Sequence, residues 1–120
     1  MSAVENMRFF FKGVAIDVKT RQYIEKRLGT LDKFLENITK SEVEIDLDKK
    51  GKFRVEVMVH TARNMFRAEN TTATIESAID IATDELQTQI THMKDKIRTL
   101  KKRGAQSIKK KTVLDKAARF

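Results

Sequence analysis

The chain has 120 residues, of which 40% are apolar and 35% charged, a balance typical of a globular protein with a single core. It has no cysteine, which excludes disulfides and thiolate metal sites, and no apolar run approaches the roughly 18 residues that span a membrane. The N-terminal residues also lack the pattern of a secretion signal. We therefore expect a cytoplasmic protein that makes no contact with membranes.

The positive charge is concentrated near the C-terminus. Residues 1–93 contain 14 Lys or Arg and 15 Asp or Glu, whereas residues 94–120 contain 11 and 2, so the net charge of +8 comes from the last quarter. A cationic end on a near-neutral body is typical of proteins that bind a polyanion, because cations that neutralise phosphates release counterions. This distribution predicts a nucleic-acid partner.

The first part of the chain reads as a strand followed by a helix. Residues 1–6 are polar and unpatterned, and we expect them to be disordered. Residues 7–14 predict a strand with Phe9 and Phe11 toward the core and Phe10 on the opposite face. Asp17 is a candidate N-cap for a helix over residues 18–35, whose apolar residues recur every three or four positions.

The middle of the chain reads as three antiparallel strands. Residues 42–48 alternate strictly between carboxylate and apolar side chains, which predicts a half-buried strand. A turn at Gly51 leads to a second alternating segment at residues 53–60, and a shorter strand follows at residues 65–69.

A long helix is expected to close the fold. It begins after an N-cap at Thr74, runs to about Arg103 and ends at Gly104; its last turns should extend past the sheet and expose Ile97 and Leu100. Residues 7–103 then form the domain, and residues 104–120 a flexible basic tail.

These elements predict an α+β fold of order β-α-β-β-β-α. A strand, helix, strand sequence favours a right-handed parallel crossover, so we expect a four-stranded mixed sheet with both helices on one face. The open face of the sheet should be acidic, and the helix side and C-terminal end basic.

No catalytic or metal site is predicted. The carboxylates of residues 42–48 are interpreted as a solvated strand face with partners such as Arg54. His60 and His92 have no ligand or nucleophile close by in the sequence and are interpreted as surface residues. We expect no enzyme activity, no metal, no cofactor and no small-molecule substrate.

In the order and spacing of several segments, the chain resembles the short form of the bacterial ribosome hibernation promoting factors. This group includes ribosome-associated inhibitor A. The resemblance covers residues 7–98 and is carried by Lys12-Gly13-Val14-Ala15-Ile16, Arg21-Gln22-Tyr23-Ile24-Glu25-Lys26-Arg27-Leu28, Leu31-Asp32-Lys33-Phe34, Phe53-Arg54-Val55-Glu56-Val57, Arg67-Ala68-Glu69, Ser77-Ala78-Ile79-Asp80 and Leu86-Gln87-Thr88-Gln89-Ile90.

The resemblance implies a fold similar to a double-stranded-RNA-binding domain and a stress or stationary-phase role. Such a factor lodges on the small ribosomal subunit, competes with mRNA and with A-site and P-site tRNA, blocks translation and stabilises inactive ribosomes. The positions matching the family's rRNA-binding residues are Arg21, Arg27, Lys33, Lys94 and Lys96. The family's basic positions along the second helix are here Glu85, Thr88, Thr91 and His92. We expect the basic C-terminal end to compensate by reaching phosphates further along the channel; its cations are Arg98, Lys101, Lys102, Arg103 and Lys109-Lys110-Lys111.

Two alternatives stay open at this point. A generic RNA-binding or nucleoid-associated module would share the fold and the basic end. Within the resembled family, some short members help ribosomes to pair, with a separate factor, and others carry an extension that prevents pairing. The tail of this chain is as long as that extension but basic, so the sequence does not decide between these roles.

Overall fold

The computed structural model describes the backbone of residues 6–113 and the side chains of residues 6–100. The elements are β1 (Met7–Lys12), α1 (Val18–Gly29), the 3₁₀ helix η1 (Thr30–Lys33), β2 (Ile38–Leu47), β3 (Phe53–Thr61), β4 (Met65–Thr72) and α2 (Ile75–Val113). The chain divides into two units, Met1–Ile90 and Thr91–Phe120, and the boundary falls within α2. None of the described helices combines the length and the hydropathy that crossing a bilayer requires.

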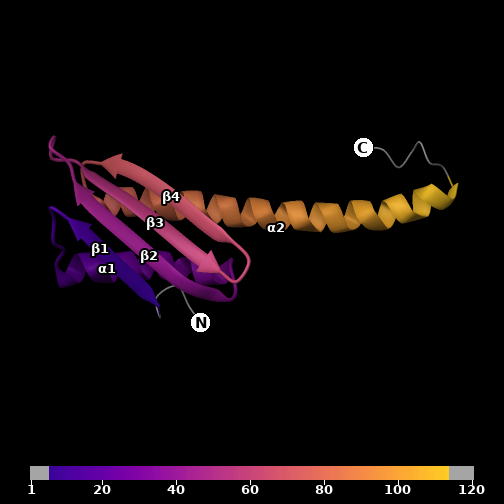
Figure 1. Cartoon of the computed structure of the whole chain (residues 1–120), viewed down its shortest axis with the longest axis horizontal. Helices are drawn as coiled ribbons and strands as arrows, with labels where there is room; N and C mark the ends of the chain where they lie inside the picture. Colours follow the sequence, from indigo (N-terminus) through magenta and orange to yellow (C-terminus); the bar gives the residue numbers. More distant parts are fainter. Residues whose placement is uncertain (1–5, 114–120) are drawn as a thin grey trace. The chain divides into compact units, whose positions relative to one another are not determined.

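The sheet has the strand order β1-β2-β3-β4 (Figure 1). β1 pairs with β2 in parallel, and the other neighbours pair antiparallel. The register aligns Phe9, Val43, Val57 and Ala68 in one row across the four strands. The predicted mixed sheet and its parallel crossover are therefore confirmed.

Both helices cover the apolar face of this sheet, as predicted. Figure 1 shows α1 and the first turns of α2 behind the strands. Ile24 and Leu28 of α1, and Ile79, Leu86 and Ile90 of α2, are fully buried, as are the inward-facing valines of the sheet. Since these positions recur every three or four residues in the helices and every second residue in the strands, the sequence pattern specifies which face each element buries.

Local hydrogen bonds fix where the helices begin and how the central hairpin turns. The Asp17 carboxylate accepts a hydrogen bond from the Thr20 amide (2.8 Å), and the Thr74 hydroxyl accepts one from the Ser77 amide (3.1 Å), so both predicted N-caps are present. Gly51 adopts a φ of +82° in the turn between β2 and β3. Asp48 accepts hydrogen bonds from the amides of residues 50 and 52 and belongs to this turn.

The first helix and strand are shorter than predicted. α1 ends at Gly29 and continues as η1, whereas the sequence pattern predicted one helix over residues 18–35. The weak helix propensity of glycine, together with the Thr30 hydroxyl donating to the Arg27 carbonyl (2.6 Å), favours this change. β1 ends at Lys12 because Gly13 leaves the extended conformation, with a φ of +71°. Phe11 faces the core side but is 45% exposed, since β1 lies at the edge of the sheet.

The second helix is longer than predicted, because α2 continues through Gly104 to Val113. A glycine inside a helix costs only about 1 kcal/mol, and the flanking segments are rich in Lys and Arg, which favour helix. The predicted helix end at Gly104 is therefore wrong. The division between domain and tail at residues 103 and 104 stays a prediction, and the predicted disorder of residues 1–5 and 114–120 lies outside the described residues.

Candidate nucleic-acid interface

Four basic side chains of the first helical segment are exposed and form no ion pair with any described residue. We call them the α1–η1 cations: Lys19, Arg21, Lys26 and Lys33. Lys19 and Lys26 are separated by seven residues, so they lie on the same side of α1, about 10.5 Å apart along its axis. Buried Ile24 and Leu28 turn this side toward solvent. The charge of these groups is therefore available to an external anion.

Arg27, the neighbour of Lys26, is held by the second helix. Its Nε lies 2.9 Å from Asp80 Oδ1, and its Nη2 lies 3.5 Å from Asp84 Oδ1. The Tyr23 hydroxyl donates to the same Asp80 oxygen (2.5 Å), and this hydrogen bond, with partial burial, raises the pKa of Tyr23. Arg27 thus joins α1 to α2, and its charge is partly compensated within the protein.

Arg21 is a predicted site residue that contacts the edge strand β1. Its guanidinium carbon lies 4.8 Å from the centroid of the Phe9 ring, a cation–π geometry. The Phe9 ring stacks in turn on that of Phe11, with 6.0 Å between the centroids and 13° between the planes. Arg21 therefore combines a free positive charge with a fixed position on an aromatic surface.

In the C-terminal unit, Lys94, Lys96 and Arg98 are exposed on α2. Arg98 forms an ion pair with Asp95, one turn earlier in the helix, whereas the two lysines form none with the described side chains. Lys101, Lys102 and Arg103 lie on the helical backbone, but their side chains are outside the described part of the structure. Each unit thus carries exposed cations that were predicted as site residues, and their binding to RNA stays a proposal.

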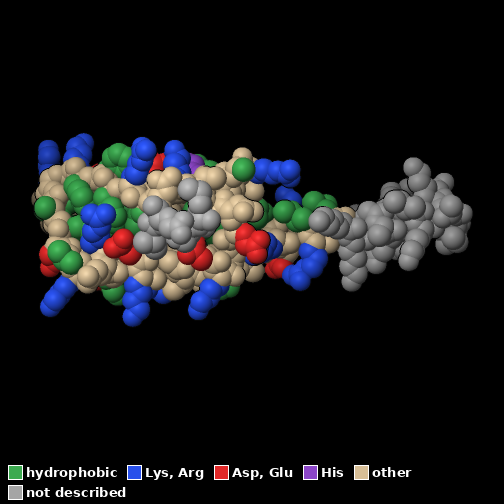
Figure 2. Space-filling view, turned by 90° about the horizontal axis from the view of Figure 1, so that it is seen from below, with side chains coloured by type: hydrophobic (Ala, Val, Ile, Leu, Met, Phe, Trp, Pro, Cys, Tyr) green, Lys and Arg blue, Asp and Glu red, His purple; other side chains and the backbone are tan. Residues whose placement is uncertain are grey.

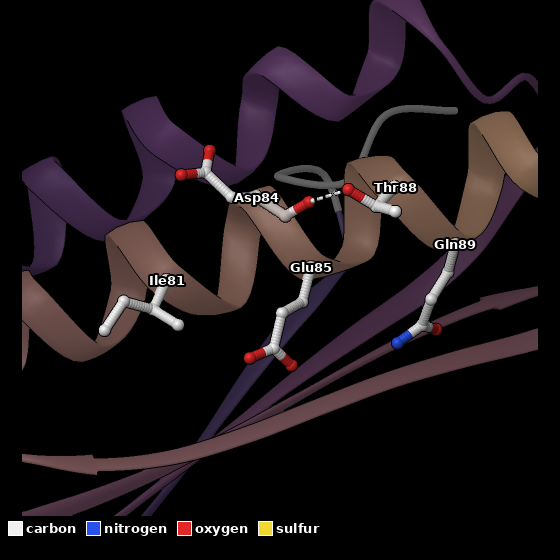
Figure 3. Close-up of a pocket in the computed structure, with 5 residues that line it drawn as sticks. All are labelled: Ile81, Asp84, Glu85, Thr88 and Gln89. Atoms are coloured by element: carbon white, nitrogen blue, oxygen red, sulfur yellow. Dashed lines mark hydrogen bonds between the residues drawn. The ribbon is translucent and has the colours of Figure 1, made fainter.

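The part of α2 within the first unit is acidic. Between Ile75 and Ile90 it carries Glu76, Asp80, Asp84 and Glu85 and no basic residue. A surface hollow of 420 Å³ lies here, lined by Ile81, Asp84, Glu85, Thr88 and Gln89 (Figure 3). Its two carboxylates disfavour phosphate, so this surface is unsuited to contact RNA. The expectation that the helix side is basic is therefore wrong for this part of α2, whereas α1 and η1 carry exposed cations.

The open face of the sheet is a network of ion pairs. Arg54 contacts Asp46 (3.0 Å) and Glu69 (3.1 Å), as well as Glu44 and Glu56 at longer distances. Arg67 also pairs with Glu56 and Glu69. Hydrogen bonds from Arg54 are the main cause that lowers the pKa of Glu69. The predicted cross-strand role of Arg54 is confirmed, but this face carries compensating cations and is less acidic than expected.

The remaining titratable groups form no recognisable reaction centre. No group of three or more His, Asp or Glu side chains within the described residues is placed to hold a metal ion. His60 Nε2 lies 2.9 Å from Glu42 Oε1 on the open sheet face, and His92 is exposed on α2.

Figure 2 shows a face on which Lys and Arg side chains stand along both margins, with Asp and Glu between them.

Sequence reasoning missed two candidate residues, Lys19 and Lys26, and gave Arg27 a role that the geometry weakens. The position of each residue around the helix axis distinguishes exposed Lys26 from Arg27, which faces α2. Lys26 follows buried Ile24 by two positions and points away from the core, whereas Arg27 follows it by three and lies at the border with α2. The partner of Arg27 could not be identified from the sequence, because Asp80 is 53 residues away.

A four-stranded mixed sheet with two helices on one face, and unpaired cations along the first helix, define a small α+β protein suited to bind a polyanion. A comparison with protein families then identifies the group. The model of the family described as sigma 54 modulation protein / S30EA ribosomal protein matches residues 7–98. The chain belongs to this family, which is that of the ribosome hibernation factors.

Individual relatives agree with this assignment. A ribosome hibernation promotion factor of Deinococcus radiodurans is 31% identical over 96 residues, covering 77% of this chain and 49% of that protein. The chain thus spans about half the length of this curated relative.

Two solved structures share the fold. The crystal structure of the Protein Y N-terminal domain of Thermus thermophilus matches with a TM-score of 0.67 and 30% identity, over 73% of this chain and 98% of that one. A ribosomal subunit interface protein of Coxiella burnetii matches with a TM-score of 0.61 and 20% identity, over 74% and 99% of the two chains, and shows the fold alone. The predicted fold class and family resemblance are confirmed.

Proposed function

We propose that the chain acts as a ribosome hibernation factor that binds ribosomal RNA of the small subunit. Its place is the channel that otherwise holds mRNA and the A-site and P-site tRNAs. Translation stops because the channel is occupied, without any catalysed reaction, and the inactive ribosome is stabilised. The protein acts in the cytoplasm and needs no cofactor.

One observation carries this proposal beyond family membership, namely that the α1–η1 cations are exposed and uncompensated. In a chain whose open sheet face and α2 N-terminal half are rich in ion pairs or carboxylates, these side chains are available for phosphates. Each phosphate that a cation neutralises adds affinity that declines with salt. Modules of this kind bind folded RNA through its shape and backbone, which suits a fixed site in ribosomal RNA.

The C-terminal part of α2 supplies the second set of cations. Lys94 and Lys111 are separated by 17 residues of continuous helix, so the basic segment extends over about 25 Å. We propose that this segment compensates for the positive charge that α2 lacks at Glu85, Thr88, Thr91 and His92, by reaching phosphates further along the channel. Removal of residues 104–120 should then weaken ribosome binding and reduce its salt dependence; unchanged affinity and salt dependence would contradict this role.

Sedimentation of the full chain with purified ribosomes tests the main proposal. We expect the protein to move with intact ribosomes and with isolated small subunits, and excess tRNA to displace it from both. Recovery of the protein only in the free fraction, at moderate salt, would reject the proposal.

The same experiment separates hibernation from generic RNA binding. A generic RNA-binding or nucleoid-associated module would bind naked RNA or DNA about as tightly as it binds ribosomes. We expect a clear preference for small subunits over an equal mass of protein-free ribosomal RNA, because protein-free RNA lacks the assembled channel.

A further inference from the structure

The edge of the sheet carries an aromatic surface that the α1–η1 cations alone do not explain. Phe9 and Phe11 lie two residues apart on β1, so both side chains face the helix side. Their rings are nearly parallel, and the Arg21 guanidinium lies against Phe9. Phe9 is half-buried, whereas Phe11 is 45% exposed. Two nearly parallel aromatic rings with a guanidinium beside them thus reach the surface at Phe11.

The exposed Phe11 ring is in unfavourable contact with water. An apolar surface left in water forgoes the favourable free energy that its burial would provide. β1 is an edge strand and pairs with β2 on one side. A partner that lays a flat apolar surface on Phe11 would recover part of this free energy.

The charges around the stack indicate what kind of partner fits. Arg21, which lies against Phe9, is exposed and forms no ion pair with the described side chains. Arg8 and Lys12 lie on the opposite face of β1, with Phe10. β1 itself contains no carboxylate, and the nearby Asp17 caps α1 through the Thr20 amide. A partner for this edge therefore combines a flat π surface with negative charge, and an unpaired nucleotide has both.

We propose that the exposed ring of Phe11, beside Phe9 and Arg21, holds an unpaired base of the bound RNA, with Arg21 contacting a neighbouring phosphate. Single-stranded RNA is recognised in this manner, by bases stacked on aromatic rings and on Arg guanidinium planes. Stacking tolerates any base, because every base has a π face. This proposal rests on the proposed function, to which it adds a contact with a single nucleotide.

Substitutions on β1 provide a matched set. Phe11→Leu retains apolar bulk but removes the ring, and Phe11→Tyr retains the ring. Phe10→Leu is the control, since Phe10 is 46% exposed, nearly the same as Phe11, but lies on the opposite face of the strand. Loss of one stacked base should weaken binding by roughly 5- to 100-fold.

The first measurement is ultraviolet crosslinking of the full chain bound to small ribosomal subunits, followed by tryptic digestion. We expect residues 9–12 to be recovered with an attached nucleotide from the wild type, Phe11→Tyr and Phe10→Leu. Phe11→Leu should lose the crosslink and bind more weakly. If Phe11→Leu binds as tightly as Phe10→Leu, the stacking proposal is wrong while ribosome binding stands.

The second measurement needs no ribosome and therefore tests the stack even if the proposed function fails. A single-stranded RNA oligonucleotide with a 2-aminopurine base reports stacking through quenching of its fluorescence. We expect the wild type and Phe10→Leu to quench the probe more strongly than Phe11→Leu does at saturation. Equal quenching by all three proteins, with unchanged circular dichroism spectra, would overturn the proposal.

Discussion

Neutralising either of two adjacent cations of α1 should affect a different property, ribosome binding in one case and folding stability in the other. Lys26 is exposed without an ion pair to the described residues, whereas Arg27 is bound to Asp80 at 2.9 Å. Lys26→Gln and Arg27→Gln each remove one positive charge and retain good helix propensity. We expect Lys26→Gln to reduce ribosome binding and Arg27→Gln to reduce stability.

The magnitudes follow from the geometry. One lost phosphate contact lowers the slope of log affinity against log salt by about 0.7–0.9, which corresponds to roughly five- to eightfold weaker binding at 0.1 M salt. The side chains of Arg27 and Asp80 are 30% and 45% exposed, so solvent screens their attraction, and its loss should cost at most about 1 kcal/mol. Lys26→Gln should leave the free energy of unfolding within about 0.5 kcal/mol of the wild type.

The assay measures binding to small subunits over about 0.05 to 0.3 M monovalent salt at fixed Mg²⁺, beside urea unfolding of the free proteins. The reasoning would be refuted if both variants lost the same salt slope, because a diffuse charge effect would then explain binding. It would also be refuted if Arg27→Gln weakened binding while unfolding at the wild-type urea concentration.

Three further predictions concern stability, each measured by urea unfolding. The Ser41 hydroxyl is buried without a hydrogen-bond partner in the described structure, so Ser41→Ala should raise the free energy of unfolding by about 1 kcal/mol; a loss would reveal a partner. Ile79 is fully buried between α2 and the sheet, and Ile79→Ala should cost about 2–5 kcal/mol, so a cost below about 1 would contradict its core position. Arg54 lowers the folded-state pKa of Glu69 below its ordinary 4.5, so Glu69 stabilises the fold above that pH, and this contribution is lost as the pH falls through the folded-state value. Glu69→Gln should therefore be less stable at neutral pH and lose less stability on acidification, whereas an unchanged pH dependence would exclude this role.

The sheet was predictable because its determinants are local. Strict alternation in β2 specifies which side chains are buried, and the turn at Gly51 fixes the pairing with β3. The partner role of Arg54 followed from the same alternation. Helix starts were equally readable, since a capping side chain lies within three residues of the amide it binds.

The errors concern features that depend on distant residues or on small energy differences. The partnership of Arg27 with Asp80 requires the packing of α1 on α2, which the sequence does not show. Each helix contains one glycine, which lowers helix stability by about 1 kcal/mol. α1 ends at Gly29, whereas α2 continues through Gly104, so a difference this small does not predict where a helix ends. Phe11 was assigned to the core from alternation, whereas its exposure follows from the place of β1 at the edge of the sheet.

The proposed obstruction of the decoding channel can be tested directly by a competition measurement. Small subunits saturated with the full chain are offered labelled mRNA and tRNA, and the binding of each is compared with that to empty subunits. The account predicts that bound protein excludes both A-site and P-site tRNA, and that excess tRNA and mRNA release the protein. Subunits that retain the protein while binding message and both tRNAs at full occupancy would contradict it.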